Sequence, residues 1–205
     1  KNRVNKKFIY LISPNRIKDN LFYYNLEQVL KTKKVSYFQL RLKNEKLKTK
    51  ISIGKKIKKI CKKYNVKFLV NDDPQLAKKI NSDGCHLGQK DMSILKARKI
   101  LKNKIIGITC HNSINLIKKA VKDNASYIAI GAFFASRTKK VKFKASIQLL
   151  NYAKNITNIP IIPIGGIKFS NYKKLLLNKA NFLAISGYIW NNKKYKPLDA
   201  IKKLK

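Results

Sequence analysis

Eight short runs of apolar residues, most of them β-branched or aromatic, recur along the chain. The runs alternate with longer lysine-rich stretches. The runs cover residues 8–13, 37–42, 67–72, 84–88, 105–110, 127–132, 159–165 and 181–187. Short apolar runs that end in polar or glycine residues are typical of buried strands. The intervening segments 51–64, 93–101, 114–123, 145–155 and 171–178 repeat apolar residues with helical spacing, which predicts amphipathic helices.

This alternation predicts an α/β fold of parallel strands joined by right-handed helical crossovers. Eight such units close naturally into a (β/α)8 TIM barrel, which is the fold class that we expect. A doubly wound open sheet is the main alternative, because the pattern alone does not prove closure. We find no linker or low-complexity tract, so residues 1–205 are expected to form one single barrel domain.

The charge balance is strongly basic, with 48 Lys plus Arg against 9 Asp plus Glu and a net charge of +39. Such a charge is typical of nucleic-acid-binding proteins. The lysines are spread over nearly every helical segment, however, and few of the cations are the arginines that grip phosphates in a forked geometry. We therefore expect a solvated basic surface, with nucleic-acid binding unlikely beyond non-specific charge attraction.

The three cysteines, Cys61, Cys85 and Cys110, form no CxxC pair and are odd in number. They are therefore expected to be small buried residues of a protein in a reducing compartment. The apolar run at 8–12 is far too short to cross a membrane. We expect a cytoplasmic protein without a membrane partner.

Polar residues stand where the predicted strands end, and in this fold those ends build the active site. Gln39, Arg41 and Lys43 alternate at the end of the second run, and Asp72 and Asp91 follow the third and fourth. Two carboxylates on neighbouring strands can share one Mg²⁺, which commonly also binds substrate phosphate oxygens. The surrounding cations Arg41, Lys43 and Lys139 would suit a diphosphate.

Helix capping is the alternative role for these acids, since Asp is a favourable first-turn cap. Asp91 precedes the predicted helix at 93–101 by two residues. Asp73 stands directly before Pro74, so Asp73 is expected to be the cap and Asp72 is left for the metal.

Glycine-containing turns follow the last two predicted strands, at Gly165, Gly166 and the Ser186-Gly187 step. Such turns lead into helix N-termini and commonly bind a phosphate in barrels. A metal-bridged diphosphate at one site and a phosphate monoester at the other would indicate a transferase with diphosphate as the leaving group.

From residue 10 to residue 186 the sequence resembles the thiamine phosphate synthases. The matching stretches are 38–43, 70–72, 83–91, 107–111, 131–139 and 164–167, and their order and spacing are specific together. The resemblance implies a transferase of thiamine biosynthesis. Such an enzyme joins 4-amino-5-hydroxymethyl-2-methylpyrimidine diphosphate to 4-methyl-5-(2-phosphoethyl)thiazole, giving thiamine phosphate and diphosphate.

The resemblance also implies a role for each matching residue. The pyrimidine diphosphate would be held by Gln39, Arg41, Lys43, Asn71, Thr109 and Lys139, of which Arg41, Lys43 and Lys139 would be catalytic. Mg²⁺ would be held by Asp72 and Asp91. The thiazole phosphate would be held by Ser136, Thr138, Gly165, Gly166, Ile185 and Ser186. The family chemistry starts with departure of diphosphate, so His86 and His111 need no acid–base role.

The sequence departs from the family pattern in the loop that follows the sixth run, where Ala132 and Ala135 replace prolines. Loss of proline raises the entropy cost of ordering that loop. Two other functions remain possible at this point. A thiazole tautomerase of the same superfamily would not need the diphosphate-binding residues, and a nucleic-acid-binding protein would follow from the charge alone.

Overall fold

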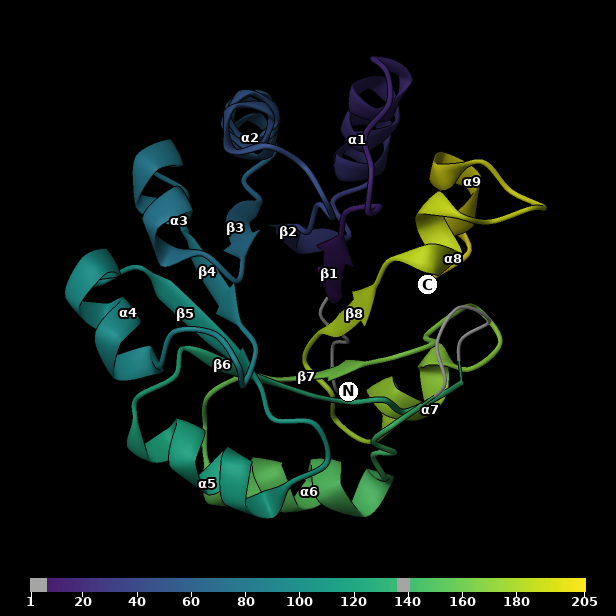
Figure 1. The fold of residues 1–205 in the computed structure, drawn as a ribbon. Coiled ribbons are helices and arrows are strands. Elements are labelled where there is room, and N and C mark those ends of the chain that lie inside the picture. The colour runs from purple at the N-terminus through teal and green to yellow at the C-terminus, as the bar shows by residue number, and fades with distance from the viewer. Residues whose placement is uncertain (1–6, 136–140) are drawn as a thin grey trace.

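The computed structural model describes residues 7–135 and 141–205, and its strands and helices alternate along the chain (Figure 1). The strands are β1 (Ile9–Ile12), β2 (Val35–Leu40), β3 (Lys67–Asn71), β4 (Gly84–Leu87), β5 (Ile105–Thr109), β6 (Tyr127–Gly131), β7 (Ile161–Ile164) and β8 (Leu183–Ile185). The helices are α1 (Leu21–Lys31), α2 (Leu47–Lys63), α3 (Pro74–Ile80), α4 (Ile94–Leu101), α5 (Ile114–Lys122), α6 (Ile147–Ile156), α7 (Tyr172–Leu177), α8 (Gly187–Trp190) and α9 (Pro197–Lys202).

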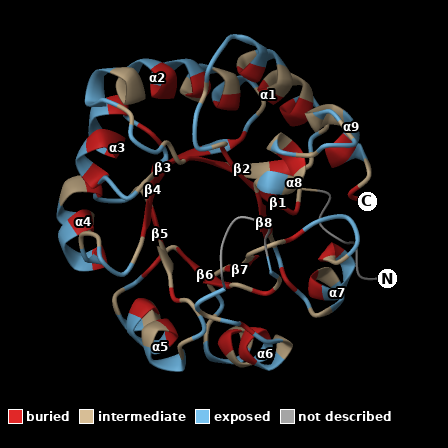
Figure 2. Ribbon diagram, turned by 45° about the vertical axis from the view of Figure 1, so that its right-hand side comes forward, coloured by how far each residue is buried: buried red, intermediate tan, exposed pale blue. Residues whose placement is uncertain are grey.

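All neighbouring strands pair in parallel, in the order β7-β6-β5-β4-β3-β2-β1-β8. The two ends of this order, β7 and β8, contact each other, so the sheet forms a nearly closed barrel inside a ring of helices (Figure 2). The predicted TIM barrel is therefore confirmed, and the open doubly wound sheet is wrong. The mouth of the barrel gathers the carboxyl ends of the strands, where the candidate site residues stand.

The buried residues form two clusters, one on each face of the sheet. The larger cluster fills the space between strands and helices, which is why the strands are apolar on both faces. The smaller cluster lies inside the barrel and is built around Tyr10, Leu69, Tyr127 and Ile162. This interior contains two tyrosines, so their hydroxyl groups need partners within it.

Four helices begin at side-chain caps, and each cap satisfies a free N–H of the first helical turn. Ser93, Ser113 and Ser146 cap α4, α5 and α6, and Asp73 caps α3. The expected helix boundaries agree with the observed ones to within two residues, except that α2 begins four residues before the expected start at 51.

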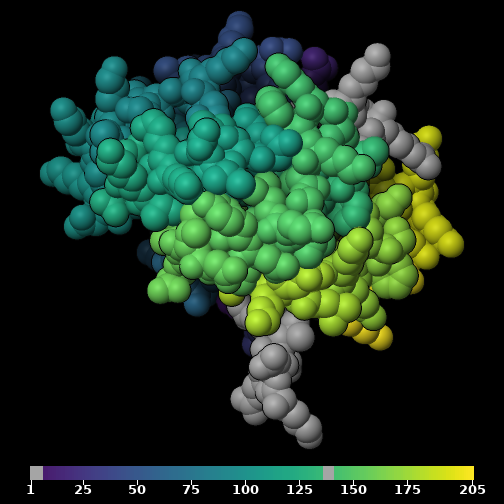
Figure 3. Space-filling view, turned by 90° about the horizontal axis from the view of Figure 1, so that it is seen from below, coloured from purple at the N-terminus to yellow at the C-terminus, as the bar shows by residue number. Residues whose placement is uncertain are grey.

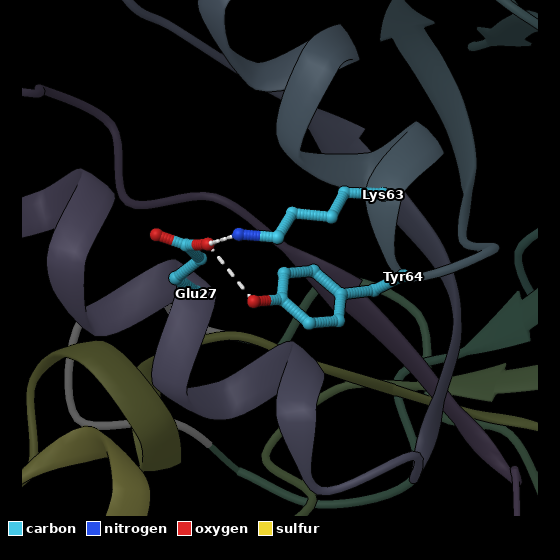
Figure 4. A network of polar contacts seen from close by, with 3 residues as sticks. All are labelled: Glu27, Lys63 and Tyr64. Atoms are coloured by element: carbon cyan, nitrogen blue, oxygen red, sulfur yellow. Dashed lines mark hydrogen bonds and ion pairs between the residues drawn. The ribbon is translucent and has the colours of Figure 1, made fainter.

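Acidic side chains are scarce, and the described part of the chain contains two ion pairs, Lys63–Glu27 and Lys119–Asp123. Glu27 of α1 accepts from the Lys63 ammonium at 2.7 Å and from the Tyr64 hydroxyl at 2.8 Å, which ties α1 to the end of α2 (Figure 4). On the opposite side of the barrel, α5 and α6 form a continuous outer surface (Figure 3). No helix in the described ranges is long and apolar enough to cross a membrane.

Candidate active site

Two carboxylates meet at the carboxyl ends of β3 and β4. Asp72 follows β3 directly, in a left-handed backbone conformation (φ 66°), and its N–H donates to the His86 carbonyl at 2.7 Å. Asp91 lies in the loop after β4, where its Oδ2 accepts from the Gly88 N–H at 2.7 Å. That bond leaves lone pairs on the Asp91 carboxylate for a further ligand.

The pKa of Asp72 is raised to about 6. Partial burial is the main cause, and a hydrogen bond and charge repulsion from Asp91 add to it. The positive charge of Arg41 and a hydrogen bond from Asn71 act in the opposite direction. Arg41, Asn71 and Asp91 are thus close enough to Asp72 to act on its charge. The sequence-predicted residues of three different strand ends are brought together here.

The pair Asp72–Asp91 fits a hard divalent cation such as Mg²⁺. Neither carboxylate forms an ion pair with a described lysine or arginine, so their mutual repulsion is uncompensated by direct contact. Within the described residues, no group of three His, Cys, Asp or Glu side chains could hold a metal. Two carboxylates with open positions are what Mg²⁺ takes when substrate phosphates and waters complete its coordination.

The observed N-caps of α3 and α4 show which of the acids cap helices. The Asp73 carboxylate accepts from the Leu76 N–H at 3.0 Å, so the prediction that Asp73 caps its helix is confirmed. The cap of α4 is Ser93, whose hydroxyl accepts from the Lys96 N–H at 3.3 Å. The alternative in which Asp91 merely caps that helix is therefore wrong.

The three polar residues of the second strand end lie at different depths. Gln39 is buried inside the barrel, and Arg41 is partly buried one residue beyond β2. The Arg41 guanidinium donates to Asn15 Oδ1 at 3.2 Å, and the backbone N–H of Arg41 donates to Ser13 Oγ at 2.8 Å. Lys43 lies in an exposed bend, because the extended chain stops at Leu40. The predicted arrangement, with Gln39, Arg41 and Lys43 at alternate positions of one extended strand, therefore does not extend to Lys43.

The glycine turn after β7 packs tightly against the segment that follows β6. Gly165 and Gly166 have φ of 105° and 60°, and a Cβ on Gly165 would lie 2.4 Å from Ala132 Cβ. These positions therefore need glycine for both backbone and space. Helix α7 begins at Tyr172, one residue after the expected start at 171, so this turn leads into a helix as expected.

The turn after β8 also leads into a helix, as expected. Ile185 is buried at the end of β8, and Ser186 is the N-cap residue of the single-turn helix α8. The Ser186 hydroxyl donates to the Ser13 carbonyl at 3.2 Å, which ties β8 to the end of β1. The space around Gly187 is open, since a Cβ there would meet no atom within 4 Å.

Three sequence-predicted residues, Ser136, Thr138 and Lys139, lie outside the described residues. The described residues on either side of that segment pair with each other. The Ala132 N–H donates to the Phe143 carbonyl, and the Ala145 N–H donates to the Ala132 carbonyl, both at 2.9 Å. Ala132 is therefore held by backbone hydrogen bonds to the segment that follows.

Two residues at the centre of the barrel were not predicted as functional. Tyr10 of β1 and Tyr127 of β6 join their hydroxyls at 2.6 Å. The Tyr10 hydroxyl also accepts a hydrogen bond from Gln39 Nε2, and the Tyr127 hydroxyl is hydrogen-bonded to His86 Nδ1. His86 Nε2 is in turn hydrogen-bonded to Thr109 Oγ1. The sequence did carry a signal for this pair, namely tyrosines inside strands that are otherwise apolar. A tyrosine in a fully buried strand must place its hydroxyl against a hydrogen-bond partner. His111, in contrast, lies against Phe143 with ring centroids 4.3 Å apart.

Comparison with protein families finds a match between residues 9–189 and the family described as thiamine monophosphate synthase. The thiamine-phosphate synthase of Pelagibacter ubique is 71% identical over 204 residues, covering 100% of this chain and 99% of the relative. That of Saccharophagus degradans is 41% identical over 152 residues, covering 74% and 70%. Among solved structures, thiamine phosphate pyrophosphorylase from Pyrococcus furiosus superimposes with a TM-score of 0.85 at 26% identity, covering 99% of this chain and 96% of that one.

Proposed function

The chain belongs to the thiamine monophosphate synthase family and functions as a thiamine-phosphate synthase, and we propose how its residues carry out that reaction. The substrates would be 4-amino-5-hydroxymethyl-2-methylpyrimidine diphosphate and 4-methyl-5-(2-phosphoethyl)thiazole. The products would be thiamine phosphate and diphosphate. The proposal is supported most directly by the surroundings of Asp72 at the barrel mouth, where the Asp91 carboxylate repels its charge and the Arg41 guanidinium attracts it.

Residues at the ends of β2 to β5 would bind the pyrimidine diphosphate. Asp72 and Asp91 would hold Mg²⁺, which when bound would neutralise negative charge on the diphosphate. Arg41 would donate to the diphosphate oxygens from its place near Asp72. The described contacts also suit Gln39 and Asn71 as partners of the same substrate. Lys43 and Lys139 keep the catalytic role that the family resemblance implies.

Residues at the ends of β7 and β8 would bind the thiazole phosphate. Gly165 and Gly166 give a turn in which backbone N–H groups can approach a ligand closely. Ser186 and Ile185 stand at the neighbouring strand end, and Ser136 and Thr138 would complete this site. The two anionic groups would thus occupy opposite sides of one barrel mouth.

The chemical step would consist of bond cleavage followed by capture. As the C–O bond to diphosphate breaks, negative charge grows on the leaving oxygen, and Arg41 stabilises that charge. The 4-amino group of the pyrimidine supports the cation that is left. The thiazole nitrogen then forms the new C–N bond, and the protein's contribution to this capture is to hold the two rings in position. No protein group needs to transfer a proton in this sequence.

Product formation tests the proposal directly. Purified protein incubated with both substrates and Mg²⁺ is expected to release thiamine phosphate and diphosphate in a ratio of one to one. Removal of Mg²⁺ with a chelator is expected to stop both. The rival thiazole tautomerase would form neither product, and the 71% identical relative is itself a thiamine-phosphate synthase. A nucleic-acid-binding protein would likewise leave both substrates unchanged.

The raised pKa of Asp72 predicts a pH dependence of stability that Mg²⁺ opposes. The folded state binds the Asp72 proton more tightly than the unfolded state, so without metal this residue lowers stability as pH rises from about 4 through about 6. A full shift of two pH units in the pKa of Asp72 would be worth roughly 3 kcal/mol, and solvent screening of this only partly buried carboxylate reduces it to about 1 kcal/mol.

The matched variant for this prediction is Asp72→Asn, measured by chemical unfolding. Without metal, Asp72→Asn is expected to gain about 1 kcal/mol relative to the wild type between pH 4.5 and pH 7.5. At pH 7.5, Mg²⁺ at 100 times its dissociation constant is expected to stabilise the wild type by about 2.7 kcal/mol and the variant much less. A relative loss of stability in the variant as pH rises would contradict the electrostatic account of the pair.

We further propose that residues 1–205 act as one catalytic domain, because the candidate residues come from strand ends around the whole barrel. The protein would work in the cytoplasm. The three cysteines support this location, since all of them are free and buried, as expected in a reducing compartment.

A further inference from the structure

A chain of hydrogen bonds crosses the interior of the barrel from β2 to β5. Gln39 Nε2 donates to the Tyr10 hydroxyl at 2.7 Å, and the Tyr10 and Tyr127 hydroxyls are 2.6 Å apart. The Tyr127 hydroxyl lies 2.7 Å from His86 Nδ1, and His86 Nε2 lies 2.7 Å from Thr109 Oγ1. We call Gln39, Tyr10, Tyr127, His86 and Thr109 the barrel relay. Its two ends are residues assigned above to the pyrimidine substrate.

The interior of the relay is closed to water. Tyr10 and Tyr127 are 2% and 1% exposed, and His86 is 7% exposed. Each buried hydroxyl proton must therefore find an acceptor inside the protein. The His86 ring is enclosed with one hydroxyl oxygen at each nitrogen, Tyr127 at Nδ1 and Thr109 at Nε2, both at 2.7 Å. A neutral imidazole carries a single proton, so one of its nitrogens donates and the other accepts.

These constraints fix the direction of every bond in the relay. Because the Gln39 amide donates to Tyr10, the Tyr10 hydroxyl must give its own proton to Tyr127. Tyr127 then donates to His86 Nδ1, which leaves the imidazole proton on Nε2. His86 Nε2 donates to Thr109 Oγ1, so the Thr109 hydroxyl keeps its proton for another partner.

The two ends consequently offer a matched pair of groups. The Gln39 carbonyl oxygen Oε1 has no hydrogen-bond partner among the described residues, and no buried side-chain oxygen or nitrogen there lacks one, so Oε1 is accessible. At the other end, Thr109 has a free O–H donor. An acceptor at Gln39 and a donor at Thr109 complement an aminopyrimidine, which carries an amino donor and ring-nitrogen acceptors.

We propose that Tyr10, Tyr127 and His86 are positioning residues that fix the amide of Gln39 as an acceptor and the hydroxyl of Thr109 as a donor, and so select an aminopyrimidine ring. The proposal rests on the proposed function for the identity of the substrate. None of the three residues needs to touch that substrate. Reversing the proton order would rotate the Gln39 amide and turn the Thr109 proton inward, so the two ends change together.

The His86 tautomer tests the relay without any substrate. The chain contains two histidines, so selective ¹⁵N-histidine labelling gives two imidazoles to resolve, and a His111→Gln variant assigns them. At pH 7.5 we expect His86 to be neutral, protonated on Nε2 and unprotonated on Nδ1. The Tyr127→Phe variant is expected to remove this preference, because Nδ1 loses its donor. A wild-type His86 protonated on Nδ1 would overturn the proposed order.

Substrate discrimination tests the functional consequence. The probes are the pyrimidine diphosphate and an analogue in which hydrogen replaces the 4-amino group, with binding measured calorimetrically in the presence of Mg²⁺. The wild type is expected to prefer the amino compound by about 10-fold, as for one well-placed hydrogen bond. Tyr10→Phe and Tyr127→Phe are expected to bring this ratio close to one, while binding of the thiazole phosphate is unchanged.

Tyr37→Phe is the matched control. Tyr37 packs against Tyr10 with ring centroids 5.6 Å apart, yet within the described residues its hydroxyl forms no hydrogen bond with the relay. The control is expected to keep the wild-type ratio and tautomer. If all three tyrosine variants show the same preference for the amino compound, the tyrosines act only through packing and the proposal is refuted. Failure of the wild type to form thiamine phosphate would refute the proposed function instead, while the tautomer measurement would still test the relay.

Discussion

Replacing both Asp72 and Asp91 by asparagine is expected to lower turnover by at least about 1,000-fold, the effect of losing a principal electrostatic stabiliser of the leaving group. Asparagine matches aspartate in size and keeps an oxygen that can accept from the Gly88 N–H, so the loop after β4 should hold its shape. The loss would then report the missing charge. Steady-state rates measured over a range of Mg²⁺ concentrations check this expectation.

The control for that experiment is Asp73→Asn, the residue next to Asp72 between β3 and α3. Asparagine caps a helix about as well as aspartate, so α3 should remain intact while one negative charge is removed. We expect its turnover to stay within about 2-fold of the wild type, as is usual for a change outside the reacting groups. Magnesium-dependent turnover that survives in the double variant would exclude Asp72 and Asp91 as the metal ligands.

The second large effect is expected at Arg41. Arg41→Ala should lower kcat/KM for the pyrimidine diphosphate by about 100- to 1,000-fold, because a preorganised donor to the developing charge is lost. The KM for the thiazole phosphate should hardly change, since that substrate would bind at the ends of β7 and β8. Arg41→Lys should recover part of the loss, because lysine restores the charge without the forked geometry.

Arg16→Ala provides the matched comparison for Arg41. Arg16 is an exposed arginine on the β1–α1 connection and carries the same charge. A general loss of positive potential would slow both variants alike, and raising the salt concentration would reduce that loss. A specific role predicts a large effect at Arg41 and little at Arg16. Similar small losses in both variants would remove Arg41 from the proposed machinery.

The strand pattern predicted the fold well, because a buried parallel strand must be apolar on both faces and leaves a clear sequence signal. Closure was harder to predict, since the contact between β7 and β8 leaves no mark in the composition of either strand. Helix α3 was visible mainly through its cap, Asp73 before Pro74. The single turn of α8 and the six residues of α9 are too short to show a periodicity.

The candidate site was predictable where chemistry restricts the residue type. Acids are rare in this chain, so Asp72 and Asp91 stood out, and the strand order explains why they meet. Tyr10 and Tyr127 escaped notice because tyrosine in an apolar run is ordinary strand composition. Their hydroxyls lie against each other only because β1 and β6 face each other across the interior, a relation that spans 117 residues of sequence.

Anomalous diffraction from crystals grown with Mn²⁺ and the pyrimidine diphosphate tests the central claim most directly. Mn²⁺ accepts the same carboxylate and phosphate oxygens as Mg²⁺ and is located by its own scattering. The account predicts one metal peak within about 2.2 Å of a carboxylate oxygen of both Asp72 and Asp91, with diphosphate oxygens completing its coordination beside Arg41. A metal and diphosphate bound elsewhere, with both carboxylates free of ligand, would contradict it.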